Sequence, residues 1–226
     1  MASMPLQLYT YWRSMAAYRV RVAMALKGLC VEEIPLDILA GDQFRAEFIE
    51  LNPEGAVPAL VEGREPALTQ SMAILEYLEE CWPGPPLLPP DPRGRARVRS
   101  LCAVIVSDTH PLLVPRVRSY LREHGFNEEA GREWSSHWMT RAARVIEARL
   151  ARDTETGAFC HGEQVTLADI CLASLFTLGK AAGFTLDDAP TIERILRRCE
   201  ATEAFQNAMP RPFGAAPTAD RLPPDV

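Results

Sequence analysis

A proline-rich segment, "CWPGPPLLPPDP", interrupts the chain at residues 81–92 and constrains the fold more than any other stretch. It holds six of the 19 prolines in this chain of 226 residues. Each proline fixes φ and lacks a backbone donor, so the segment is neither a helix interior nor a central strand. We expect a stiff, partly extended linker at residues 83–92, between a first domain at 1–82 and a second at 93–226.

Before the linker, strand-like and helix-like patterns alternate along the chain. Apolar strand patterns at residues 6–11 and 31–38 flank a helical pattern at 17–28, which stops at Gly28. The elements expected after these are a short helix at 42–52, two strands at 56–63 and 66–70, and an amphipathic helix at 71–82. The order β-α-β-α-β-β-α predicts a small α/β domain.

After the linker, the sequence shows no convincing strand pattern. Four segments are helical in period, namely residues 94–125, 127–153, 166–183 and 191–201. Thr166 followed by Asp169 predicts a capping box at the start of the third segment. We therefore expect an all-α second domain with short loops. A second proline-rich run, residues 210–226, is expected to form a draped or mobile tail.

Charge and composition exclude several classes of protein. A net charge of −6 argues against a nucleic-acid binder, which needs a basic face. No apolar run approaches the length of a transmembrane helix, and the N-terminus lacks the pattern of a signal peptide. The six cysteines are scattered, which is typical of reduced thiols in the cytoplasm. Neither they nor the four histidines show zinc-ligand spacing, so we expect no metal site.

Three features of the first domain lie where a ligand can bind. Ser14 stands between the first strand and the first helix, and Gln70-Ser71 stands where the fourth strand meets the last helix. If the Val57–Pro58 bond is cis, it leaves the backbone of Val57 free at a strand edge, where an extended peptide can pair. The hydroxyl and N–H groups at Ser71 form a site for a carboxylate. A peptide-like anion fits these three places.

Each of these features also has a simpler structural interpretation. A serine before a helix is commonly an N-cap, and Gln70-Ser71 can serve the same purpose. Pro58 can simply mark the start of a strand. Their ordered combination within one domain favours a binding site.

Longer motifs resemble one known superfamily. "VPAL" followed by "QSMAILEYLEE" resembles the glutathione-binding signature of the glutathione transferases, and "TLADI" resembles their folding motif. More narrowly, "YWRSMAAYRVRVAMALKG", "LNPEGAVPALVEG", "LLPPDPRGRARVRSL", "DTHPLLVPRV" and "EAFQNAMP" resemble the zeta class, which includes maleylacetoacetate and maleylpyruvate isomerases. The resemblance covers nearly the whole chain. It implies a thioredoxin-like first domain, an all-α second domain and a homodimer.

The resemblance also implies a glutathione site. Its residues are Ser14, Gln43, Val57, Pro58, Gln70 and Ser71, with His110 as the first contribution of the second domain. In zeta-class enzymes the serine that matches Ser14 donates a hydrogen bond to the glutathione sulfur. Such a donor, together with a helix N-terminus, lowers a thiol pKa from about 8.5 and favours the thiolate.

Arginines are the expected binders of the substrate. Arg13 and Arg116 are our candidates for holding carboxylates and stabilising an enolate oxygen, because the guanidinium presents a fixed fork of donors. Arg13 and Arg19 add positive charge near Ser14, and surface charge is the alternative interpretation of both. His110 is equally compatible with a structural histidine.

The expected activity is a glutathione-dependent cis–trans isomerisation of maleylacetoacetate or maleylpyruvate, in the catabolism of aromatic compounds. The expected partners are glutathione and a small anionic electrophile. Two departures from the class favour an alternative, a broader glutathione transferase or dehalogenase. Ala16 stands where zeta enzymes commonly have cysteine, and Gly183 stands where the isomerases often have arginine. A binding protein without activity is a third hypothesis, against which the retained glutathione-site residues argue.

Overall fold

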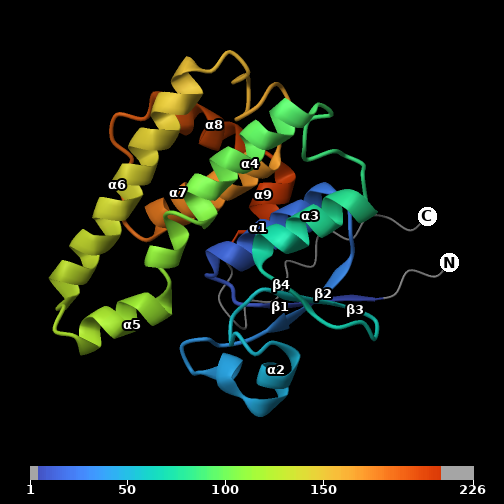
Figure 1. The fold of residues 1–226 in the computed structure, drawn as a ribbon, viewed down its shortest axis with the longest axis vertical. Coiled ribbons are helices and arrows are strands. Elements are labelled where there is room, and N and C mark those ends of the chain that lie inside the picture. The colour runs from blue at the N-terminus through green and yellow to red at the C-terminus, as the bar shows by residue number, and fades with distance from the viewer. Residues whose placement is uncertain (1–4, 210–226) are drawn as a thin grey trace.

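A four-stranded sheet with strand order β2-β1-β3-β4 forms the centre of the N-terminal domain in the computed structural model, which describes residues 5–209 (Figure 1). The strands are β1 (Leu6–Thr10), β2 (Val31–Pro35), β3 (Ala59–Glu62) and β4 (Leu68–Thr69). β1 pairs with β2 in parallel, whereas the β1–β3 and β3–β4 pairs are antiparallel. The predicted strands are all present but shorter than expected.

Helices cover both faces of this sheet. They are α1 (Met15–Leu26), η1 (Asp42–Phe44), α2 (Ala46–Leu51) and α3 (Ser71–Cys81). α1 and α3 pack against each other on one face, and α2 lies on the other (Figure 1). The prediction of a single helix at 42–52 is wrong in one respect. Arg45 adopts an extended conformation and divides it into η1 and α2.

The rest of the described chain is helical. Its elements are α4 (Pro92–Val106), η2 (His110–Leu112), α5 (Pro115–Glu123), α6 (Glu128–Arg152), α7 (Leu167–Ala181), α8 (Pro190–Glu200) and α9 (Glu203–Asn207). No strand follows β4 within residues 5–209, so the predicted α/β and all-α fold class is confirmed. The helical pattern predicted at 94–125 is divided into α4, η2 and α5. The tail predicted at 210–226 lies outside the described residues.

α7 is the central helix of the second domain. It is buried from Leu167 to Gly179 and packs against α1, α4 and α8. The capping box predicted at its start is confirmed. The backbone N–H and the hydroxyl of Thr166 each donate to Asp169 Oδ2 at 2.8 Å. Burial raises the pKa of Asp169, although these hydrogen bonds oppose the shift.

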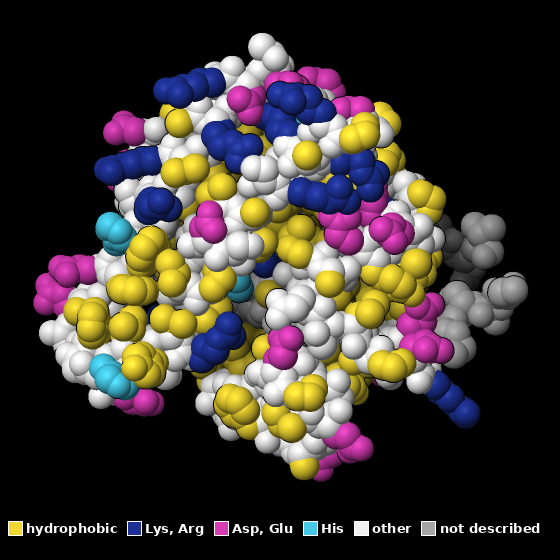
Figure 2. Space-filling model, viewed as in Figure 1, with side chains coloured by type: hydrophobic (Ala, Val, Ile, Leu, Met, Phe, Trp, Pro, Cys, Tyr) yellow, Lys and Arg dark blue, Asp and Glu magenta, His cyan; other side chains and the backbone are white. Residues whose placement is uncertain are grey.

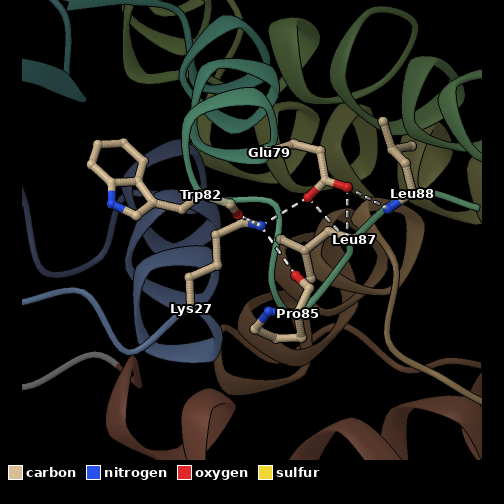
Figure 3. Close-up of polar contacts among 6 residues, drawn as sticks. All are labelled: Lys27, Glu79, Trp82, Pro85, Leu87 and Leu88. Atoms are coloured by element: carbon tan, nitrogen blue, oxygen red, sulfur yellow. Dashed lines mark hydrogen bonds and ion pairs between the residues drawn. The ribbon is translucent and has the colours of Figure 1, made fainter.

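A buried ion pair anchors the proline-rich segment between the domains (Figure 3). Lys27 Nζ lies 2.8 Å from Glu79 Oε2 and also donates to the carbonyls of Trp82 and Pro85. The Glu79 carboxylate accepts from the backbone N–H of Leu87 at 3.0 Å, and from that of the next residue. The segment is therefore held by side chains of α3 and of the residue that follows α1.

The predicted domain boundaries at 82/83 and 92/93 stay a prediction, but α4 begins one residue earlier than that division implies. Pro92 occupies the first position of α4, where a missing N–H costs nothing. Asp91 caps the helix by accepting from the N–H of Gly94 at 2.8 Å. Across residues 5–209, every helix falls short, in length or in apolar character, of what a membrane crossing requires.

Candidate functional site

The register of the sheet brings three segments to one end of it. Tyr9 of β1 pairs with Ala59 of β3, and Ala59 pairs with Thr69 of β4. Because antiparallel neighbours run in opposite directions, the chain leaves β1, enters β3 and leaves β4 at the same end. The segments that meet there are residues 10–14, 57–58 and 70–71.

The hydroxyl of Ser14 caps α1. Its oxygen accepts a hydrogen bond from the backbone N–H of Ala17 at 3.2 Å, as the capping interpretation predicts. The hydroxyl proton has no acceptor among residues 5–209, and the side chain is partly exposed. A hydroxyl can accept and donate at once, so capping leaves Ser14 free to donate to a bound group.

The Val57–Pro58 peptide bond is cis. Pro58 directly precedes β3, which lies between β1 and β4, so the expectation of a strand edge at this point is wrong. The ladder begins only at Ala59, however, and neither backbone group of Val57 has a hydrogen-bond partner within residues 5–209. These groups remain available for an extended ligand.

Gln70 and Ser71 form an unusual helix start. Gln70 has a φ of 65°, a left-handed conformation that is uncommon for a residue other than glycine. Its side chain does not cap α3, because its Nε2 donates to Glu54 Oε2 at 2.7 Å instead. The N-terminus of α3 therefore lacks a side-chain cap, which leaves its N–H groups and positive dipole end for an anion.

Gln43 lies in η1, close to the loop that leads to Val57. A Cβ on Gly55 would lie 3.4 Å from the carbonyl oxygen of Gln43, so η1 packs directly on this loop. The Gln43 amide donates to the carbonyl of Ile38 at 3.2 Å, but its buried Oε1 has no partner within the described chain. Such an oxygen is free to accept from a ligand N–H.

Arg19 is buried, so the interpretation of its charge as surface charge is wrong. Its Nε donates to Ser174 Oγ of α7 at 2.8 Å, and its Nη1 donates to Ser71 Oγ at 3.0 Å. Sequence reasoning named only its charge. The signal for burial was the apolar character of its surroundings, because the residues from Ala17 to Met24 are apolar apart from Arg19 and Arg21, and all of them are buried.

His110 opens η2, and the charges of two guanidinium groups act on it. Burial, and then the positive charges of Arg19 and Arg116, lower its pKa from 6.5 to about 3. No residue of the described chain hydrogen-bonds its ring, and the side chain is partly exposed. His110 is therefore a neutral imidazole at ordinary pH, with ring nitrogens available to a ligand.

Arg13 and Arg116 are both exposed. The Arg13 guanidinium lies over the ring of Trp12, 5.5 Å from its centroid, in a cation–π contact. Arg116 is the second residue of α5, and its charge acts on His110. Neither arginine forms an ion pair within residues 5–209. Figure 2 shows basic and histidine side chains in a hollow where α1 begins, with hydrophobic side chains around it.

The two departures from the zeta pattern lie at different elements. Ala16 is in the first turn of α1, two residues after Ser14. Gly183 follows the end of α7 and has a φ of 92°, in the left-handed region that favours glycine. No thiol is available at the first position and no guanidinium at the second.

Taken together, these groups fit an extended, peptide-like anion. The N-terminus of α3 suits a carboxylate, the free backbone of Val57 suits a peptide unit, and Ser14 offers a hydroxyl proton beside the start of α1. Within residues 5–209, Arg19 and Arg116 are basic groups without acidic partners. The arrangement can therefore bind two anionic molecules side by side and stabilise negative charge that develops between them.

Comparison with known proteins gives the class. Residues 4–80 match the family model "Glutathione S-transferase, N-terminal domain". The maleylacetoacetate isomerase of Pseudomonas aeruginosa is 38% identical over 207 residues, which are 91% of this chain and 96% of that protein. An α/β domain with this sheet, followed by a helical domain, is thus the fold of a glutathione transferase.

Solved structures narrow the class further. A maleylacetoacetate isomerase from Methylobacterium extorquens AM1, with bound malonate and GSH, is 46% identical with a TM-score of 0.89 over 91% of this chain and 98% of that one. A holo maleyl pyruvate isomerase, a bacterial glutathione S-transferase of the zeta class, is 35% identical with a TM-score of 0.88, covering 92% and 100%. The chain belongs to the zeta-class glutathione transferases, the family of the maleylacetoacetate isomerases.

Proposed function

We propose that the protein is a glutathione-dependent cis–trans isomerase of maleylacetoacetate or maleylpyruvate, acting in the breakdown of aromatic compounds. The observation that carries the proposal is the Ser14 hydroxyl, whose proton has no acceptor in the described chain, at the N-terminus of α1 and beside an uncapped α3. The relative with bound malonate and GSH supports it, since malonate is a small dicarboxylate.

Glutathione fits the three segments at the end of the sheet. Its glutamyl carboxylate would lie at Gln70, Ser71 and the first N–H groups of α3. Its cysteinyl backbone would pair with Val57, which directly precedes the cis bond to Pro58. The Oε1 of Gln43, which has no partner within residues 5–209, would accept from a ligand N–H near the same loop.

Ser14 and the N-terminus of α1 would activate the glutathione thiol. The hydroxyl donates to the sulfur, and the positive end of the helix dipole favours the charged form, so both lower the thiol pKa. With alanine at position 16, this activation does not involve an enzyme thiol at that position.

The substrate is held by groups from both domains. Bound glutathione would supply a thiolate able to add to the cis double bond and to leave again after rotation about the resulting single bond. Arg13 and Arg116 would bind the carboxylates and stabilise the enolate oxygen, because guanidinium groups fit both in pairs of hydrogen bonds. His110 would form a hydrogen bond there as a neutral imidazole, since its lowered pKa keeps the ring uncharged.

The test is an isomerase assay on the purified chain. With glutathione present, the absorbance of maleylacetoacetate or maleylpyruvate should change at a rate proportional to enzyme concentration, and without glutathione it should not. No change with either substrate would reject the proposal. A set of halogenated acids and aryl halides assayed beside them tests the second candidate.

That second candidate is a broader transferase or dehalogenase acting on small electrophiles. Ala16 and Gly183 favour it, because these two positions supply neither a thiol nor a guanidinium. Activity on halogenated compounds, together with none on the isomerase substrates, would select it. The glutathione site is the same under both functions.

We further propose that the protein is a cytoplasmic homodimer. A shallow groove of about 300 Å³ runs between α3 and α4 and is lined largely by apolar side chains, namely those of Met72, Ala73, Cys102, Ala103 and Val106. Arg99 and Glu76 form a two-pronged ion pair at the same groove, at 2.7 and 2.6 Å. A second copy of the chain would cover this surface. Free, largely buried cysteines support a reducing compartment.

A further inference from the structure

We infer that Arg19 is a positioning residue for ligand binding, one that fixes the Ser71 hydroxyl as a donor to the glutamyl carboxylate of glutathione. The inference rests on the proposed glutathione site. It assigns a role to a residue that touches neither the sulfur nor the substrate, and it explains why a guanidinium is buried between α1, α3 and α7.

The direction of each hydrogen bond around Arg19 follows from the donors present. The hydroxyl of Ser174 donates to the carbonyl of Cys171 at 2.7 Å, so its oxygen is left to accept from Arg19 Nε at 2.8 Å. Guanidinium groups only donate, so Ser71 Oγ must also accept, from Nη1 at 3.0 Å. The Ser71 proton then points elsewhere, and no described residue accepts it.

The place to which that proton is free to point is the start of α3. Ser71 is the first residue of α3, and the side chain of Gln70 leaves this end uncapped. A carboxylate bound there would accept from the Ser71 hydroxyl as well as from backbone N–H groups. Because Arg19 already donates to the same oxygen, it polarises the hydroxyl and strengthens that bond.

The charge of Arg19 also favours a ligand carboxylate at Ser71. Within residues 5–209, its hydrogen-bond partners are two neutral hydroxyls and no carboxylate, and its buried Nη2 has no partner. A buried cation without a counter-ion is costly, and a ligand carboxylate at Ser71 would lower that cost. Burial lowers the pKa of Arg19, but the guanidinium stays protonated at ordinary pH.

The experiment measures binding of two probes by isothermal titration calorimetry. The first is glutathione, and the second is the analogue in which 4-aminobutyrate replaces the glutamyl residue, so that the α-carboxylate is absent while the amino group is kept. The variants are Arg19→Lys, which keeps the charge but not the fork, Ser71→Ala, and both together. Circular dichroism and urea unfolding establish that each variant is folded.

Arg19→Lys should weaken glutathione binding about tenfold or more, the size of one charge-assisted hydrogen bond, and should change analogue binding less than about twofold. In the Ser71→Ala background, Arg19→Lys should weaken glutathione binding by less than about twofold. The KM for glutathione should rise while kcat at saturating glutathione changes little. Ser174→Ala removes the acceptor of Arg19 Nε, so it should also weaken glutathione binding, but less than Arg19→Lys does. This variant replaces Arg19→Lys in the experiment if Arg19→Lys does not fold.

Two results would overturn the inference. One is an equal loss of affinity for both probes, which would make Arg19 a purely structural residue. The other is a full loss on Arg19→Lys in the Ser71→Ala background, which would mean that it does not act through that hydroxyl. Failure of the proposed glutathione site is a distinct outcome, because the unmodified protein would then bind neither probe.

Discussion

Lys27 Nζ and Glu79 Oε2 lie 2.8 Å apart in the interior, and each side chain also binds the backbone of the segment that joins the two domains (Figure 3). The Lys27 side chain is fully enclosed. Its charge has one carboxylate partner and two carbonyl partners, whereas Glu79 accepts from two backbone N–H groups. The pair therefore couples the end of α1 to α3 and to the proline-rich segment.

Lys27→Met should lower the free energy of unfolding by about 3 kcal/mol, because it leaves the Glu79 carboxylate buried without its counter-charge. Urea unfolding followed by circular dichroism measures the loss. The matched control is Arg132→Met on α6, whose ion pair with Glu128 is exposed and spans 3.8 Å. That change should cost no more than about 0.5 kcal/mol. Equal losses in the two variants would contradict a structural role for the buried pair.

Ser14→Ala should reduce turnover by one or more orders of magnitude while lowering stability by only about 1 kcal/mol, the value of an N-cap. The control is Asn127→Ala, which removes the cap of α6, where Asn127 accepts from the N–H of Ala130 at 2.9 Å. Both variants lose a cap, so their stability losses should be similar, but Asn127→Ala should keep full turnover. If Ser14→Ala also kept it, Ser14 would be a cap and nothing more.

His110 should stay neutral far below its ordinary pKa. Its pKa in the folded protein is about 3, against 6.5 for the free side chain, so between these values the unfolded chain binds the proton more readily. As far as His110 is concerned, the free energy of unfolding therefore has its full value above about pH 6.5, and it decreases as the pH falls toward 3. Proton NMR titration of the ring, assigned by the signal missing in His110→Gln, tests this. A midpoint near 6.5 would show that the ring is not desolvated as described.

Ala103→Glu should convert the proposed homodimer into monomers. Ala103 is exposed on α4 and lines the groove between α3 and α4, so a carboxylate there would be buried without a partner in a dimer. Analytical ultracentrifugation gives the mass of each variant. Ala148→Glu, at an exposed site on α6, should leave the mass unchanged. A wild-type protein that sediments as a monomer would reject the dimer itself.

Much of the architecture was predictable because the signals are local. Proline spacing located the break in regular structure between α3 and α4, and apolar periodicity located every strand and nearly every helix within residues 5–209. Errors occurred where one residue departs from its neighbours, as at Arg45, which divides η1 from α2. The strand edge expected at Pro58 was wrong for a different reason, since strand order depends on pairing between distant segments.

Some features of the candidate site were also predictable from the sequence, whereas others depend on the tertiary structure. Ser14, the Val57–Pro58 bond and Ser71 were identified from the sequence, because each stands where a strand or helix begins or ends. Their meeting at one end of the sheet follows from the register of β1, β3 and β4. The free Oε1 of Gln43 and the lowered pKa of His110 depend on neighbours from other elements, which no local pattern encodes.

The sequence by itself therefore determined the order of the main elements, the α/β and all-α fold class and the helix caps at Ser14 and Thr166, since these depend on backbone preferences over a few residues. Only the tertiary structure decided that Arg19 is buried, with Ser71 and Ser174 as its partners at separations of 52 and 155 residues. The physical reason is the docking of α1 against α7. It removes water from a guanidinium and leaves hydroxyl groups to bind it, which is an outcome of packing between domains.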